Sequence, residues 1–165
     1  MIKHVWSVLC KESLINQKNN NVSLLEVIEQ IEIGFSIPTQ LKDQAVNIPF
    51  EFTLVSLFFR EGDSKSEEKI RLKLNFIDPK NKSLKTFEPN FDFPKDKRRL
   101  RSVVNIRGLE LTHSGTYIFR VEREIGKDKY DLLAELPIEI IIDRKLVDIS
   151  PSPSPSPEPP KSKLN

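Results

Sequence analysis

Apolar and polar residues alternate along most of the chain, and this period of two restricts its fold more than any other feature. Successive side chains of an extended strand point to opposite faces, whereas a helix needs apolar residues three or four positions apart. The pattern is clearest at residues 69–76, where Ile70, Leu72, Leu74 and Phe76 alternate with polar residues. Further alternating segments lie at residues 4–10, 30–37, 50–59, 100–106, 117–121 and 132–142. The sequence therefore predicts an all-β protein.

Two of these segments need a closer reading. In residues 4–10, strict alternation would place His4, Trp6, Val8 and Cys10 on one face. Residues 22–29 fit either a helix, because they contain a capping-box spacing, or a strand, because they are rich in β-branched residues. A strand is favoured, since the asparagines just before it suit a turn back from the first strand.

Turn residues separate the alternating segments. Asp78-Pro79-Lys80-Asn81 has Pro where a type I turn needs it and Asn where a left-handed backbone is tolerated. Gly126-Lys127-Asp128 is a second turn sequence. Seven to eight strands at this spacing predict an antiparallel β-sandwich.

The chain has 165 residues, which is enough for one ordinary domain. Residues 1–149 have the apolar content of such a domain, and we expect them to form the sandwich. Residues 150–165, SPSPSPSPEPPKSKLN, hold half of the twelve Pro. We expect this tail to be disordered and extended, serving as a spacer rather than a docking segment, although Pro157 and Pro160 make one P-x-x-P.

Composition argues against several classes of protein. Lys and Arg number 26 and Asp and Glu 24, so a net charge of +2 gives no domain-wide field for nucleic acid or an anionic membrane. No apolar run approaches the roughly 20 residues that span a bilayer. One Cys and two His are too few for a disulfide framework or a four-ligand zinc site. The apolar stretch ending at Cys10 is too short for a lipoprotein signal, so a cytoplasmic location is expected.

The opening W-S-V-L-C strand, the segment N-V-S-L-L-E-V-I-E-Q-I, and the later H-S-G-T-Y-I-F-R-V-E and A-E-L-P together resemble a family of small uncharacterised bacterial proteins. The resemblance extends over about the first 145 residues. It implies a single β-sandwich domain and brings no catalytic residues with it.

A second resemblance concerns Leu109 to Tyr117, L-x-x-x-x-x-G-x-Y. This segment is similar to the corner of immunoglobulin-type sandwiches, where a Tyr hydroxyl bonds back to the backbone. The Cys expected two residues after that Tyr is Phe119 here, so no intersheet disulfide is expected. The resemblance therefore implies an immunoglobulin-like or C2-like sandwich rather than a true immunoglobulin domain.

Catalytic and metal-ligating residue types form no recognised pattern. His113 and Ser114 are neighbours, but adjacency does not give a nucleophile its base, and we expect His113 in a turn before Gly115. Cys10 is expected to pack in the core. The carboxylates that could hold Ca²⁺ lie among lysines and form no D-x-D-x-D run. They are Asp92, Asp96, Glu122, Glu124, Asp128, Asp131 and Asp143. We expect no cofactor and no metal.

Positive charge is most concentrated in residues 95–101, K-D-K-R-R-L-R. Continued in strand register, Arg99, Arg101 and Arg107 face away from the apolar face of their segment. Arg71 and Lys73 make a second basic face, and neighbouring strands would join the two into a surface for phosphate or an acidic partner. The alternative is a solvated sheet face, or an edge protected against aggregation.

These observations favour a non-enzymatic β-sandwich module that binds another macromolecule. A protein partner is expected ahead of nucleic acid, because no stacking aromatics interleave with the basic residues. Arg99, Arg101 and Arg107 are the candidate binding residues. The Phe-rich loop at residues 87–93 is expected to fill the core. A metal-dependent enzyme or hydrolase assembled from loops is the alternative, and the oligomeric state stays open.

Overall fold

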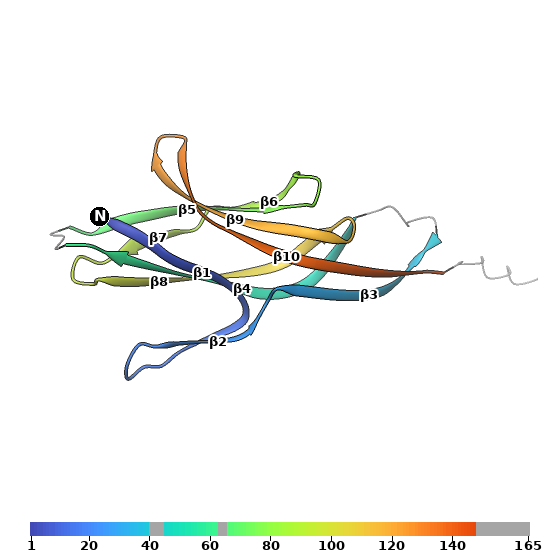
Figure 1. Cartoon of the computed structure of the whole chain (residues 1–165), viewed down its shortest axis with the longest axis horizontal. Coiled ribbons are helices and arrows are strands. Elements are labelled where there is room, and N and C mark those ends of the chain that lie inside the picture. Colours follow the sequence, from blue (N-terminus) through green and yellow to red (C-terminus); the bar gives the residue numbers. More distant parts are fainter. Residues whose placement is uncertain (40–44, 63–65, 148–165) are drawn as a thin grey trace, which may run out of the picture.

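A computed structural model of the chain describes residues 1–39, 45–62 and 66–147. Over these residues the protein is all-β, with ten strands and no helix (Figure 1). They are β1 (Ile2–Ile15), β2 (Val22–Val27), β3 (Gln30–Pro38), β4 (Val46–Arg60), β5 (Glu68–Ile77), β6 (Ser83–Phe87), β7 (Asn90–Phe93), β8 (Arg99–Leu111), β9 (Gly115–Gly126) and β10 (Lys129–Val147). The C-terminal tail at residues 150–165 lies outside the described residues.

The expectation of seven to eight strands was too low. The Phe-rich segment read as a loop contributes β7 and the end of β6, both of which pair with β5. β6 has five residues and β7 has four, with Pro89 between them, and both are too short to show alternation. Residues 22–27, left open between helix and strand, form β2.

The strands form two sheets. The first has the order β2-β1-β4-β8, and the second has the order β3-β10-β9-β5-β6, with β7 also on β5, and curls into a half-barrel. All pairs are antiparallel except β3 with β10. The antiparallel expectation was wrong at this pair, because the chain crosses between sheets after β2. The Ile28 N–H bonds the Leu9 carbonyl, and the Glu139 N–H bonds the Glu29 carbonyl, so β3 enters beside β10 in the same direction.

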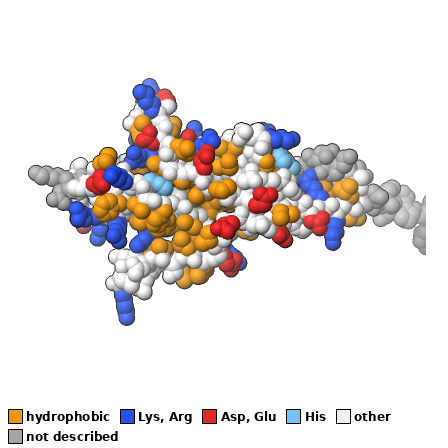
Figure 2. Space-filling model, in the orientation of Figure 1, with side chains coloured by type: hydrophobic (Ala, Val, Ile, Leu, Met, Phe, Trp, Pro, Cys, Tyr) orange, Lys and Arg blue, Asp and Glu red, His pale blue; other side chains and the backbone are white. Residues whose placement is uncertain are grey.

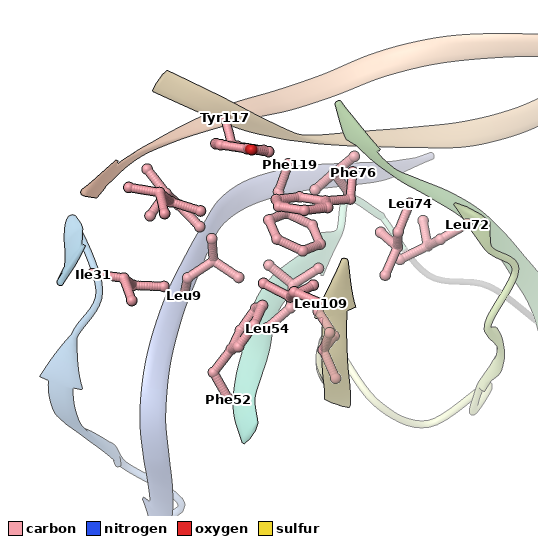
Figure 3. Close-up of a cluster of buried hydrophobic side chains, with 14 of the residues drawn as sticks. Leu9, Ile31, Phe52, Leu54, Leu72, Leu74, Phe76, Leu109, Tyr117 and Phe119 are labelled. Carbon is pink, nitrogen blue, oxygen red and sulfur yellow. The ribbon is translucent and has the colours of Figure 1, made fainter. Parts of the chain in front are cut away.

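The core lies between the sheets and follows from the alternation (Figure 3). Phe76 stacks on Tyr117, with ring centroids 5.2 Å apart, and contacts Phe119 at 4.7 Å. Phe52 of the first sheet meets Phe119 edge-on at 5.4 Å. Aromatic rings from both sheets therefore interlock at the centre, a packing that adds to the free energy of apolar burial.

A β-bulge changes which faces the β1 side chains occupy. The pairing with β4 shifts between His4 and Trp6, so His4 lies opposite Phe58 on the core side while Trp6 lies opposite Leu57 on the other. The expectation that His4 shares a face with Trp6, Val8 and Cys10 was therefore wrong. The bulge adds one residue, and one residue reverses the alternation.

Cys10 is buried on the opposite face of the sheet from the core. It pairs in register with Thr53, whose neighbour Leu54 points into the core. Its thiol donates to the Thr53 carbonyl at 3.7 Å, and burial raises the pKa of the thiol. Cys10 is thus a buried small side chain as expected, but outside the main core cluster.

The β5–β6 turn has the predicted chemistry. Asp78 Oδ1 accepts the backbone N–H groups of Lys80 at 2.9 Å and Lys82 at 2.7 Å. Asn81 has a φ of 63°, the left-handed conformation that Asn tolerates. The turn places β6 against β5.

Candidate partner-binding site

Strand β8 carries the basic residues that the sequence singled out. Leu100 pairs with Phe58 and Ile106 with Phe52, and these side chains belong to the core cluster or pack against it. Arg99, Arg101 and Arg107 occupy the alternate positions. The pairing of β8 with β4 therefore directs the three arginines away from the core, as the alternation predicted.

Two of these arginines line a hollow of about 620 Å³ between the tip of the β1–β2 hairpin and the β7–β8 turn. We call it the basic hollow. It is lined by Ile15, Asn19, Asn20, Asn21, Pro94, Lys97, Arg98, Arg99, Leu100 and Arg101. Cations form one wall, and asparagine amides form the other.

The cations of this wall are not neutralised within the described residues. Lys97, Arg98, Arg99 and Arg101 take part in no ion pair there. Moreover, Arg101 Nε is buried and has no hydrogen-bond partner in the same part of the chain. The guanidinium of Arg101 therefore has no countercharge among the described residues, and an acidic group in the hollow would supply one.

The opposite wall is held by hydrogen bonds within the hairpin. Asn16 Oδ1 accepts the Lys18 N–H at 2.9 Å, Asn19 Oδ1 accepts the Asn21 N–H at 3.0 Å, and Asn20 adopts a φ of 55°. The side-chain amides of Asn20 and Asn21 make no hydrogen bond among the described residues. They remain available as donors.

A buried arginine fixes the β7–β8 turn. Arg60 is 1% exposed, and its Nη1 donates to the carbonyls of Pro94 at 2.7 Å and Lys95 at 3.2 Å. Its Nη2 donates to the Phe93 carbonyl at 3.2 Å and lies 3.3 Å from Glu68 Oε1. The guanidinium also lies over the Phe93 ring, 4.3 Å from its centroid. These hydrogen bonds hold the backbone just before the cations of the basic hollow.

Arg107 does not belong to the basic hollow. Its Nε lies 3.2 Å from Glu51 Oε1, an exposed pair across β8 and β4. The second basic face does not join β8 either, because Arg71 and Lys73 lie on β5 in the other sheet. Arg71 pairs with Glu124 at 3.1 Å, and Lys73 lies over the Tyr130 ring.

The three phenylalanines of residues 87–93 pack inward. Phe93 is fully buried in the core cluster, and Phe87 and Phe91 pack against it. They fill the core, as the sequence predicted.

His113 and Ser114 have separate partners. His113 Nδ1 bonds the Thr112 hydroxyl at 2.6 Å, whereas Ser114 Oγ accepts the Ile142 N–H at 2.9 Å. Tyr117 bonds back to the same turn, donating its hydroxyl to the His113 carbonyl at 2.8 Å. These contacts hold the turn together, and they leave no hydrogen bond from Ser114 to an imidazole.

A different His–Ser contact was missed from the sequence. His4 Nε2 and Ser7 Oγ are 2.8 Å apart, and Ser7 Oγ and Ser56 Oγ are 2.7 Å apart. Residues three apart on a regular strand face opposite ways, so only the bulge brings them together. Burial and the nearby Arg123 guanidinium lower the pKa of His4, although a backbone hydrogen bond at Trp6 raises it. A general base must accept a proton, and this environment opposes that step.

Within residues 1–39, 45–62 and 66–147, no three His, Cys, Asp or Glu residues lie close enough to hold a metal ion. Three of the carboxylates considered for Ca²⁺ lie beside cations, Asp92 with Lys69, Glu124 with Arg71 and Asp131 with Arg123. The described residues contain no helix that is long and apolar enough to cross a membrane. In comparisons with known proteins, no family model and no curated protein matches the chain.

Proposed function

We propose that the domain is a non-enzymatic module that binds a protein partner, and that the basic hollow holds an acidic segment of that partner. The observation that carries the proposal is a set of cations on one wall that form no ion pair within the described residues, namely Lys97, Arg98, Arg99 and Arg101. Guanidinium groups bind carboxylates through two parallel hydrogen bonds, which are stronger than hydrogen bonds between neutral groups.

The lining favours a peptide segment over a nucleic acid. Among the described residues no aromatic side chain lines the hollow, so bases would find nothing there to stack on. Ile15, Pro94 and Leu100 supply apolar contacts, while the Asn20 and Asn21 amides supply neutral donors. A segment of Asp and Glu residues among apolar ones matches this mixture.

The other expectations belong to the same proposal. The Tyr117 hydroxyl bonded to the preceding turn supports an immunoglobulin-like class of sandwich. A single buried Cys and no disulfide support a cytoplasmic location.

A hydrolase or metal-dependent enzyme is the second candidate, and the His4–Ser7 hydrogen bond is the observation that favours it. If the protein is a hydrolase, Ser7→Ala abolishes hydrolysis of a small ester such as p-nitrophenyl acetate. If it is a metal-dependent enzyme, Ca²⁺, Mn²⁺ or Zn²⁺ raises its melting temperature. Unchanged hydrolysis and an unchanged melting temperature contradict it.

Titration calorimetry with two probes tests the main proposal. A deca-glutamate peptide and a deca-thymidine oligonucleotide are compared on the full chain, on R99E/R101E and on K127E/K129E. The last variant carries the same change in charge on the exposed β9–β10 hairpin. We expect peptide binding to weaken at least tenfold in R99E/R101E and less than twofold in K127E/K129E. Equal losses in the two variants, or tighter binding of the oligonucleotide, would contradict the proposal.

A further inference from the structure

The two sheets leave an open seam along one side of the molecule. β2 joins β1 only from Cys10 onward, and β3 joins β10 only from Glu139 onward. Over the described residues, the earlier half of β1 pairs only with β4, and the earlier half of β10 only with β9. Each therefore has a free backbone edge, and Figure 1 shows β1 and β10 diverging from the point where β3 begins.

Both ends of the seam are closed. At one end Arg123 Nη1 donates to the Ile2 carbonyl at 2.8 Å, and at the other the Ile28 N–H donates to the Leu9 carbonyl at 2.9 Å. The distance from Ile2 to Leu9 along a strand is about 23 Å at 3.3 Å per residue. An added strand of five or six residues fits this length.

A hollow of about 440 Å³ opens at the closed end near Leu9. It is lined by Ser7, Val8, Leu9, Val27, Ile28, Glu29, Thr116, Leu136, Pro137 and Glu139. Figure 2 shows hydrophobic side chains gathered over β1 and the space beside it, and Val27 is 53% exposed. Of the described residues, the lining contains two carboxylates and no cation, so its charge is opposite to that of the basic hollow.

The two free edges differ in what they offer. The Leu9 carbonyl already accepts a bond on the open side, and alternate residues point their backbone groups the same way. Ser7 therefore presents both its N–H and its carbonyl to the seam. On the β10 side Pro137 has no N–H, and proline is a feature that protects edges from pairing. The β1 edge is the one that can receive a new strand.

We propose that this seam accepts an extended segment of a partner polypeptide as an added strand paired with β1. Its apolar side chains fill the hollow beside Val8, Val27 and Leu136, and a Lys or Arg lies against Glu29 and Glu139. Backbone hydrogen bonds supply affinity in this mode of recognition, and the hollow supplies specificity. The inference does not depend on the basic hollow, because it concerns another surface of opposite charge.

Amide exchange measured by NMR tests it with a synthetic peptide, acetyl-Lys-Val-Thr-Val-Thr-Val-Lys-amide. The controls are a version with Glu in place of Lys and a version with methylated backbone nitrogens. We expect the Lys peptide to slow exchange of the Ser7 amide at least fivefold and to bind at least fivefold more tightly than the Glu version. The methylated peptide should give no protection.

Glu139 is exposed, and its side chain makes one hydrogen bond within the described residues, from the Thr116 hydroxyl. The variant Glu139→Lys should therefore fold. It should abolish the preference for the Lys peptide over the Glu peptide, because the new positive charge offsets the remaining Glu29. An unprotected Ser7 amide, or an unchanged preference in Glu139→Lys, would overturn the proposal. Neither result would alter the outcome for R99E/R101E, so the two proposals fail separately.

Discussion

At the scale of single residues, Tyr117 concentrates three hydrogen bonds on one hydroxyl. The hydroxyl donates to the His113 carbonyl at 2.8 Å and accepts the N–H groups of Thr112 at 3.3 Å and His113 at 3.4 Å. The ring is fully buried against Phe76. The hydroxyl therefore satisfies backbone groups that a phenylalanine would leave unpaired.

We predict that Tyr117→Phe lowers the free energy of unfolding by about 1–3 kcal/mol, the usual cost of unsatisfied buried polar groups. Urea denaturation measures the change. Tyr130→Phe is the matched control, because Tyr130 is 39% exposed, and it should change stability by less than about 0.5 kcal/mol. Equal effects of the two substitutions would show that the hydroxyl of Tyr117 has no special role.

His4 makes stability depend on pH. Its pKa is lowered from 6.5, first by burial and also by Arg123. Between the folded pKa and 6.5, the unfolded chain binds a proton that the folded chain does not. The free energy of unfolding therefore falls as the pH drops below 6.5, and this contribution is fully present only above that value.

His4→Gln should remove this contribution. Urea denaturation at pH 7.5 and pH 5 gives the loss of stability on acidification for each protein. We expect a smaller loss in His4→Gln than in the unmodified chain, with the shared carboxylates cancelling in the comparison. An identical loss in both would rule out His4 as a source of the pH dependence.

At the scale of elements, the β7–β8 turn depends on Arg60. This side chain donates hydrogen bonds to three successive backbone carbonyls, those of Phe93, Pro94 and Lys95. Arg60→Met should lower the free energy of unfolding by about 2–4 kcal/mol, because charged hydrogen bonds are lost and the carbonyls stay buried.

Arg120→Met provides the comparison for Arg60. Arg120 pairs with Glu135 at the surface, where its side chain is 39% exposed, so the loss should stay below about 1 kcal/mol. Urea unfolding measures the loss of stability in each of the two variants. A loss for Arg60→Met no larger than that for Arg120→Met would mean that the turn is held by other contacts.

Several elements could be predicted from the sequence because their information is local. Strict alternation located β5, and the Asp78–Asn81 turn carried its own geometry. The bulge after His4 could not be predicted, since nothing near it in the sequence marks one extra residue. The parallel pairing of β3 with β10 depends on contacts about a hundred residues apart, which periodicity does not report.

At the scale of the whole molecule, the candidate site was only half predictable. Alternation within β8 gave the outward direction of Arg99 and Arg101. The asparagine wall opposite them comes from the hairpin at residues 19–21, and only the tertiary fold brings it there. Arg71 could join this surface only from a strand beside β8, and the sequence left the strand order open; β5 and β8 in fact belong to different sheets.

Carbodiimide cross-linking during affinity capture tests the central claim most directly, because it joins a lysine amine to a carboxylate in contact with it. The full chain, R99E/R101E and K127E/K129E are each used to capture partners from native lysate, and cross-linked peptides are identified by mass spectrometry. We predict that Lys97 becomes joined to an Asp or Glu of one captured protein. The link should persist in K127E/K129E and disappear in R99E/R101E. A captured protein retained equally by all three, with no link to Lys97, would contradict a role for the basic hollow in binding an acidic segment.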